Sequence, residues 1–322
     1  MLDSPGSHAP AVVEGLGRSV VEVVTTSTVG VPVDVVRRAV RLVRDASIDT
    51  IVSIGGGSVV DAAKAVAFFT EREAGTPGTS FADRPVLTHV AVPTTFAPSA
   101  TSPGFAMTDP MSRNRQATSS PTLVPRWVVV DTTLVGATPQ AVLASSLLAA
   151  VDAALAAALG ARSPEAEIVG AAALARLVAV ADLLDDADVR ATAAATAVLA
   201  GRAAVNAAPS LAHALAVSFG GRRRLDHGAV LAVLLPALLD LRRLALGARL
   251  EQVAHGVGTA DLVGRLGELR EDLGLAPRLG DLGVDRDDVD AVVRAVRTTD
   301  AWAAFGGEVD EATLLATIES VR

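Results

Sequence analysis

This 322-residue sequence contains a glycine-rich run, Gly55, Gly56, Gly57 and Ser58, whose residue types could bind a ligand. It follows a buried-strand pattern, Thr50–Ile54, and precedes a helical pattern that begins at Val59. Glycines allow positive φ and close backbone approach, and a helix N-terminus offers free N–H groups to a phosphate. The sequence therefore predicts a phosphate-binding turn. An ordinary tight turn between a strand and a helix stays open as the alternative.

One lysine, Lys64, stands in a chain whose other basic residues are arginines. A position that needed only positive charge would carry arginine here, so Lys64 indicates a need for a compact ammonium. A lysine kept by chance on a helix is the alternative.

The run from Gly55 to Lys64 resembles the GGGSxxDxAK motif of the iron-containing alcohol dehydrogenase family. The stretch Pro93–Pro103 is similar to a loop of maleylacetate reductases, a branch of that family, although Pro98 and Ala100 replace its Gly and Glu. Pro98 removes a backbone donor and fixes φ, so a different loop path is expected. Besides the turn residues, the resemblance implies these contacts to NAD(P): Asp61, Lys64, Thr94, Thr95 and Ser99.

Two histidines, His213 and His227, fit the family's metal-site pattern H-x3-H-x9-H-G, and Asp152 fits a preceding D-x3-H. The resemblance implies that Asp152, His213 and His227 hold a divalent metal, zinc or iron, and that the two histidines are catalytic. One carboxylate and two imidazoles form a workable ligand set. Ala156 stands where the pattern has a fourth ligand, and Val217 where it has a further histidine. A surface aspartate with two structural histidines is the alternative.

Three consecutive arginines, residues 222–224, precede His227. Arginine forks suit a carboxylate or phosphate, so they predict a contact with an anionic substrate. A solvated basic turn is the alternative.

The elements that must position these residues are of two kinds. Residues 1–137 alternate strand and helix patterns, which predicts an α/β domain with parallel strands and crossover helices. Residues 138–322 are rich in Ala and Leu, which predicts an all-α domain carrying the metal and substrate site. The fold class is therefore α/β plus all-α, as in iron-type alcohol dehydrogenases and dehydroquinate synthase. The expected elements are helices at 35–46 and 59–69 and strands at 50–54, 89–92 and 126–131.

The resemblance covers about residues 20–239, and the family's opening strand has no counterpart in the pattern before Ala11. Residues 11–19 stand for the helix of that unit. We therefore expect an incomplete, Rossmann-like nucleotide-binding domain in a short family member. Its affinity for nicotinamide cofactors should be weak or absent.

Composition excludes several classes of protein. The net charge is −8 and the basic residues form no long run, which argues against binding to nucleic acid. The absence of cysteine excludes disulfides and thiol nucleophiles. Apolar runs are interrupted and the first ten residues do not resemble a signal peptide, so no membrane contact and a cytoplasmic location are expected. The partners expected are a small-molecule substrate and a second copy in a homodimer.

The sequence thus predicts an oxidoreductase that reduces a carbonyl or oxidises an alcohol with NAD(P). A non-redox lyase, cyclase or isomerase using the same site is one alternative, because folds host functions through their sites. A binding protein without catalysis is another.

Overall fold

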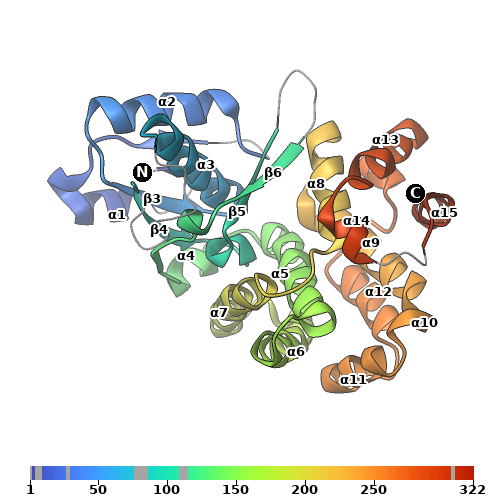
Figure 1. Ribbon diagram of the computed structural model, residues 1–322. Coiled ribbons are helices and arrows are strands. Elements are labelled where there is room, and N and C mark those ends of the chain that lie inside the picture. Colours follow the sequence, from blue (N-terminus) through green and yellow to red (C-terminus); the bar gives the residue numbers. More distant parts are fainter. Residues whose placement is uncertain (1, 4–8, 27–29, 76–85, 109–114, 306–308) are drawn as a thin grey trace.

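The computed structural model describes residues 2–3, 9–26, 30–75, 86–108, 115–305 and 309–322, and it has an α/β part followed by a helical part (Figure 1). The main sheet is parallel throughout, in the spatial order β2-β1-β3-β4-β7. Its strands are β1 (Leu2–Asp3), β2 (Val24–Thr25), β3 (Thr50–Gly55), β4 (Thr88–Pro93) and β7 (Trp127–Val128). The α/β plus all-α class expected from the sequence is confirmed.

The strand order places a topological switch point between β1 and β3. From β1 the chain moves to one side of the sheet to form β2, and it then returns to the other side for β3 and β4. In doubly wound sheets, ligands bind beyond the carboxyl ends of the strands at such a point. The turn that follows Gly55 lies at this end of β3.

The prediction that no strand precedes Ala11 is corrected. Residues Leu2 and Asp3 form β1, which pairs in parallel with both β2 and β3 in the middle of the sheet. Two residues carry no periodicity, so no pattern could have shown this strand. The helix expected at 11–19 is α1 (Ala9–Leu16), followed by a 3₁₀ turn at Gly17–Ser19.

Helices cover both faces of the sheet, which explains its continuously apolar strands. On one face Ile51 packs with Val40 of α2 (Val33–Asp45) and Val66 of α3 (Gly57–Glu73). On the other face, Ile54 packs with Leu134 of α4 (Thr132–Gly136).

A separate antiparallel hairpin, β5 (Gly104–Thr108) with β6 (Arg115–Ser119), was not expected from the sequence. Figure 1 shows it reaching from the α/β part toward α8, against which β6 packs. The third predicted strand, 126–131, is much shorter than expected, because only Trp127–Val128 form β7.

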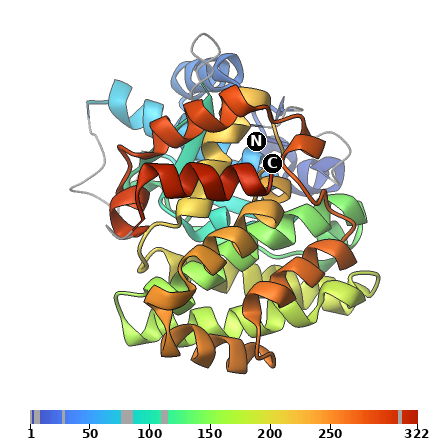
Figure 2. The same cartoon turned by 90° about the vertical axis from the view of Figure 1, so that its right-hand side faces the viewer.

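The helical part is a bundle around α5. Its main helices are α5 (Gln140–Gly160), α6 (Pro164–Ala179), α7 (Ala187–Ala204), α8 (Leu211–Arg223) and α9 (His227–Leu241). The remaining helices are α10 (Arg243–Leu246), α11 (Ala248–Val257), α12 (Leu262–Asp272), α13 (Arg286–Val296), α14 (Asp300–Phe305) and α15 (Glu311–Ser320). Figure 2 shows these later helices, in orange and red, on the side turned away from the sheet.

Helix α5 is long and apolar enough to cross a membrane by length and composition alone. In this fold it packs against α6, α7 and α9, and Leu147, Val151 and Ala154 belong to the main hydrophobic core. The apolar character of α5 is therefore that of a core helix.

A buried histidine forms a side-chain contact between two neighbouring strands. The ring Nε2 of His89 on β4 lies 2.8 Å from the hydroxyl of Ser53 on β3. Burial first, and the charge of Lys64 second, lower the pKa of His89 to about 3. The unfolded chain therefore binds a proton between pH 6.5 and 3 that the folded protein does not, and stability falls as pH is lowered through this window.

When the pH falls from 7 to 5, protonation of His89 in the unfolded chain should lower the free energy of unfolding by about 2 kcal/mol. Urea denaturation at both pH values checks it, since the double variant Ser53→Ala/His89→Leu should show that much less pH dependence. The exposed His255→Gln serves as control. Equal pH dependence in the double variant and the unaltered protein would contradict the assignment.

Candidate functional site

The glycine-rich turn predicted to bind phosphate joins β3 to the N-terminus of the 17-residue helix α3. Gly55 has a φ of +150°, which favours glycine. The turn packs on the loop after β4. A Cβ added to Gly56 would lie 3.3 Å from the Thr95 side chain, and one added to Gly57 would lie 3.4 Å from Ser99 Oγ. That Ser99 Oγ is buried and has no hydrogen-bond partner among the described residues.

These features fit a phosphate group of a dinucleotide. A helix N-terminus supplies backbone N–H groups and a favourable dipole, and Ser99 adds a hydroxyl that needs a partner. The predicted residues Thr94 and Thr95 are buried and start the loop beside the turn. The structure thus brings together the turn, Thr94, Thr95 and Ser99.

Lys64 contacts the loop that carries Ser99, and it supports the predicted phosphate position through that loop. Its ammonium is fully buried and donates to the carbonyl oxygens of Ser99 (2.5 Å), Ser102 (2.7 Å) and Gly104 (2.9 Å). Burial lowers its pKa to about 8, against the opposing effect of Asp61, so the ammonium form prevails at pH 7. Its three N–H donors are engaged by the loop, and the direct cofactor contact implied by the resemblance is corrected to a structural role.

Asp61 has a similar role. Its Oδ2 accepts the backbone N–H of Ala106 on β5 at 3.2 Å, which ties the hairpin to α3. Burial raises its pKa, while the charges of Lys64 and then Arg115 lower it.

The three predicted metal ligands lie together in the helical part. Ser210 Oγ donates to Asp152 Oδ1 at 2.6 Å, and Asp152 Oδ2 lies 3.8 Å from His213 Nδ1. His213 Nδ1 in turn lies 3.2 Å from His227 Nε2, with the two rings nearly edge to face. A continuous row of contacts therefore runs from Ser210 through Asp152 and His213 to His227.

Two helix N-termini hold the histidines. Ser210 caps α8 by accepting the N–H of His213, so the same hydroxyl fixes both the helix and the carboxylate of Asp152. Asp226 caps α9 and also accepts the Ser145 hydroxyl of α5. Ser210 was not singled out in the sequence, although a serine directly before an apolar helical pattern is a capping signal.

A glycine sets the approach of α9 to α5. A Cβ on Gly228 would overlap the backbone carbonyl of Ser145. The glycine that follows His227 in the H-G pair is therefore required by packing, and it fixes the position of His227 at the start of α9.

Both imidazoles are neutral at neutral pH. Desolvation by the surrounding protein lowers the pKa of His213, and the charge of Arg115 lowers it further. Because 57% of the His213 side chain is exposed, water screens part of both effects. Burial, then His213 and Arg115, hold the pKa of His227 well below its usual value. Burial raises the pKa of Asp152 to about 7, opposed by the hydrogen bond from Ser210.

As placed, these side chains do not complete a metal site. The described residues contain no group of three His, Asp or Glu side chains arranged to hold an ion. The two ring nitrogens, 3.2 Å apart, have the spacing of ligands on one ion, but Asp152 lies within 4 Å of His213 only and is turned to Ser210. Iron or zinc therefore does not fit this donor set without movement of the carboxylate.

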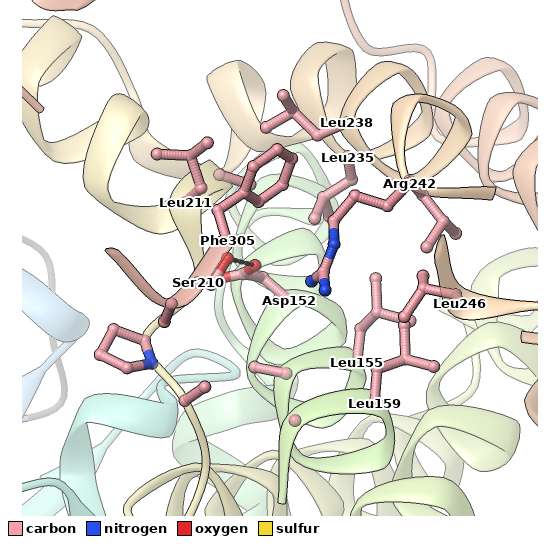
Figure 3. Close-up of a pocket in the computed structure, with 17 residues that line it drawn as sticks. Asp152, Leu155, Leu159, Ser210, Leu211, Leu235, Leu238, Arg242, Leu246 and Phe305 are labelled. Atoms are coloured by element: carbon pink, nitrogen blue, oxygen red, sulfur yellow. Dashed lines mark hydrogen bonds between the residues drawn. The ribbon is translucent and has the colours of Figure 1, made fainter. Parts of the chain in front are cut away.

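Ala156, at the missing ligand position, lines a cavity of about 90 Å³ beside Asp152 (Figure 3). Leucines from α5, α8 and α9 form part of its wall, and the guanidinium of Arg242 lies over the Phe305 ring. The alanine at position 156 leaves room here that a histidine side chain would occupy. Val217, at the other position where the pattern has a histidine, is buried in α8.

The prediction that residues 222–224 bind an anionic substrate is corrected for two of the three arginines. Arg222 and Arg223 donate to the two oxygens of Asp288, at 2.6 and 2.5 Å, and Arg223 also pairs with Asp285. Asp288 is 1% exposed and belongs to α13. These arginines hold α8 to α13, a contact that 65 intervening positions hide in the sequence.

Comparisons with known proteins agree with this geometry. The model of the iron-containing alcohol dehydrogenase family matches residues 6–132, and the model of that family's C-terminal domain matches residues 169–310. Maleylacetate reductase of Rhizobium sp. (strain MTP-10005) is 29% identical over 270 residues, which are 80% of this chain and 72% of that protein. The probable alcohol dehydrogenase EutG of Escherichia coli (strain K12) is 28% identical over 69% of this chain, but the match spans only 58% of EutG.

Solved structures show the same fold. The crystal structure of the Rhizobium maleylacetate reductase superposes with a TM-score of 0.80 at 26% identity, covering 99% of this chain and 88% of that one. Sulfoacetaldehyde reductase of Bifidobacterium kashiwanohense, solved with NAD+, has a TM-score of 0.84 at 19% identity over 99% and 90% of the two chains, which shows the fold alone. The two family models together cover most of the sequence, and this chain belongs to the iron-containing alcohol dehydrogenase family, a family of oxidoreductases.

Proposed function

We propose that this protein is an NAD(P)-dependent oxidoreductase that reduces a carbonyl or oxidises an alcohol beside His213 and His227. The observation that carries the proposal is the unpartnered, buried Ser99 hydroxyl above the N-terminus of α3, at the switch point of the sheet. The N–H groups of the turn and Ser99 would hold a phosphate of the cofactor, which supplies the hydride when bound.

The histidine pair can handle the proton of such a reaction. In a neutral pair one ring donates to the other, so the pair presents one outward N–H and one outward lone pair, whichever tautomer it adopts. An outward N–H can donate to a carbonyl oxygen, and an outward lone pair can accept the proton of an alcohol. The two roles exchange when the shared proton passes to the other ring while the outward N–H gives up its proton and the outward lone pair accepts one.

Cofactor binding is tested by titrating the purified protein with NADH and NADPH. We expect saturable binding of at least one of them, and a loss of about tenfold or more in affinity for Ser99→Asp, because its carboxylate would repel the phosphate. The exposed Ser119→Asp on β6 is the matched control. Absence of saturable binding of both cofactors to the unaltered protein would reject the proposal and favour a non-redox enzyme or a binding protein.

Metal content separates the two ways in which the histidines could act. We expect the unaltered protein to lose zinc on dialysis and Ala156→His to retain about one equivalent, because a histidine one turn after Asp152 adds a donor. His227→Ala added to Ala156→His should abolish that retention. Metal analysis after dialysis checks these expectations.

Two results would contradict these expectations about zinc. Retention of about one equivalent of zinc by the double variant Ala156→His/His227→Ala would place the metal elsewhere. Tight zinc retention by the unaltered protein would show that Asp152 turns from Ser210 to complete the site.

A further inference from the structure

The cavity beside Asp152 borders the histidine pair. Asp152, Ser210 and Ala212 line it, and Ala212 directly precedes His213 on α8. Asp152 Oδ2 lies 3.8 Å from His213 Nδ1, and the Ser210 hydroxyl joins the same carboxyl group from the other side. The cavity therefore begins beside His213, and a molecule whose oxygen meets the histidines can extend past Asp152 into it.

The cavity is long relative to its volume and largely apolar. Residues of α5 line it from Asp152 to Gly160, which is about 12 Å of helix. Among the described residues that line it, all are apolar except Asp152, Ser210 and Arg242. Ser210 donates to Asp152, and the Arg242 guanidinium lies over the Phe305 ring, so these polar groups already contact neighbours. Such a lining favours an extended aliphatic chain over a ring or a strongly polar group.

Ala156 determines how much of this space is open. It lies one turn after Asp152 on α5, and its half-buried side chain forms part of the cavity wall. The family's D-x3-H pattern has a histidine at this position, which would occupy the space. Because a cavity of about 150 Å³ holds benzene, a cavity of about 90 Å³ holds roughly four aliphatic carbon atoms.

We propose that Ala156 sets the chain length of the substrate. The alkyl chain of an aliphatic alcohol or aldehyde, about four carbons beyond the reacting carbon, occupies the cavity while the oxygen faces His213 and His227. The position of a metal ligand in the family's pattern is thus a substrate subsite in this chain. The inference rests on the proposed function and names the substrate class of the same site.

The experiment measures the affinity of the primary alcohols from ethanol to octan-1-ol by ligand-observed NMR titration, with and without NADH. We expect affinity to rise about fourfold per added methylene up to pentan-1-ol and then to level off, because the cavity is then full. Ala156→Leu fills most of the cavity, so it should weaken pentan-1-ol binding about tenfold or more relative to ethanol. Leu246→Ala enlarges the cavity and should extend the rise to longer alcohols.

Ala172→Leu, at an exposed position of α6 outside the cavity, is the matched control, and thermal unfolding verifies that each variant is folded. Equal pentan-1-ol binding by Ala156→Leu and the unaltered protein, or binding of none of the alcohols, would overturn the inference. Preferred binding of pentanoate that is lost in Arg242→Gln would also overturn it, because the guanidinium would then select the ligand. Chain-length dependence that Ala156→Leu abolishes, without NADH binding or NADH-dependent turnover, would uphold the subsite while rejecting the proposed oxidoreductase function.

Discussion

Replacing Gly228 by alanine is expected to lower the free energy of unfolding by on the order of 3 kcal/mol and to remove most activity. The new Cβ would overlap the Ser145 carbonyl, so the first turn of α9 must move away from α5. His227 is the first residue of that helix, and its 3.2 Å contact with His213 would be lost. Urea denaturation and NADH-coupled turnover measure the two effects.

The matched control is Gly256→Ala in α11, where a Cβ would meet nothing within 4 Å. Alanine there should leave stability unchanged or raise it by up to about 1 kcal/mol, because alanine favours helix more than glycine does. If Gly228→Ala behaves like Gly256→Ala, the packing of α9 on α5 does not set the site.

The second large effect is expected for Lys64→Met, which keeps the length of the side chain and removes its charge. Three buried carbonyl oxygens, of Ser99, Ser102 and Gly104, would lose their donor. We expect the free energy of unfolding to fall by about 3–5 kcal/mol. NADH affinity should fall with it, because the loop that carries Ser99 loses its anchor.

Arg41→Met on the exposed face of α2 tests whether loss of any cation gives the same result. Lys64→Arg should be intermediate, since it keeps the charge but overfills a fully buried position. Unchanged denaturation and unchanged NADH titration of Lys64→Met would show that the loop is held by other contacts.

The parts of the fold that local patterns could predict were those with long, regular elements. The helix at 35–46 and the strand at 50–54 are found as α2 and β3 within a few residues. The glycine-rich turn was recognisable because its glycines are adjacent in the sequence and lie between a strand and a helix. The hairpin β5–β6 was missed since each strand has five residues and gains its stability from pairing with the other.

The roles of individual side chains were harder to predict than the elements. Lys64 was rightly singled out as unusual, but its acceptors lie 35 to 40 residues later and only the folded chain shows that they use all its donors. The contacts of Arg222 and Arg223 could not be predicted because Asp288 is remote in sequence.

The loop that follows β4 limits how the two parts of the protein can move. Although it leaves the sheet, it is seated on the helical part: Thr101 Oγ1 donates to the Val198 carbonyl at 3.0 Å, and the Phe96 N–H donates to Ser146 Oγ at 3.2 Å. Phe96 itself belongs to the core of the helical part. The two parts therefore cannot swing open as rigid halves about a hinge between them without breaking buried contacts. Any movement around a bound molecule that leaves these contacts intact is therefore smaller than an opening of the two parts.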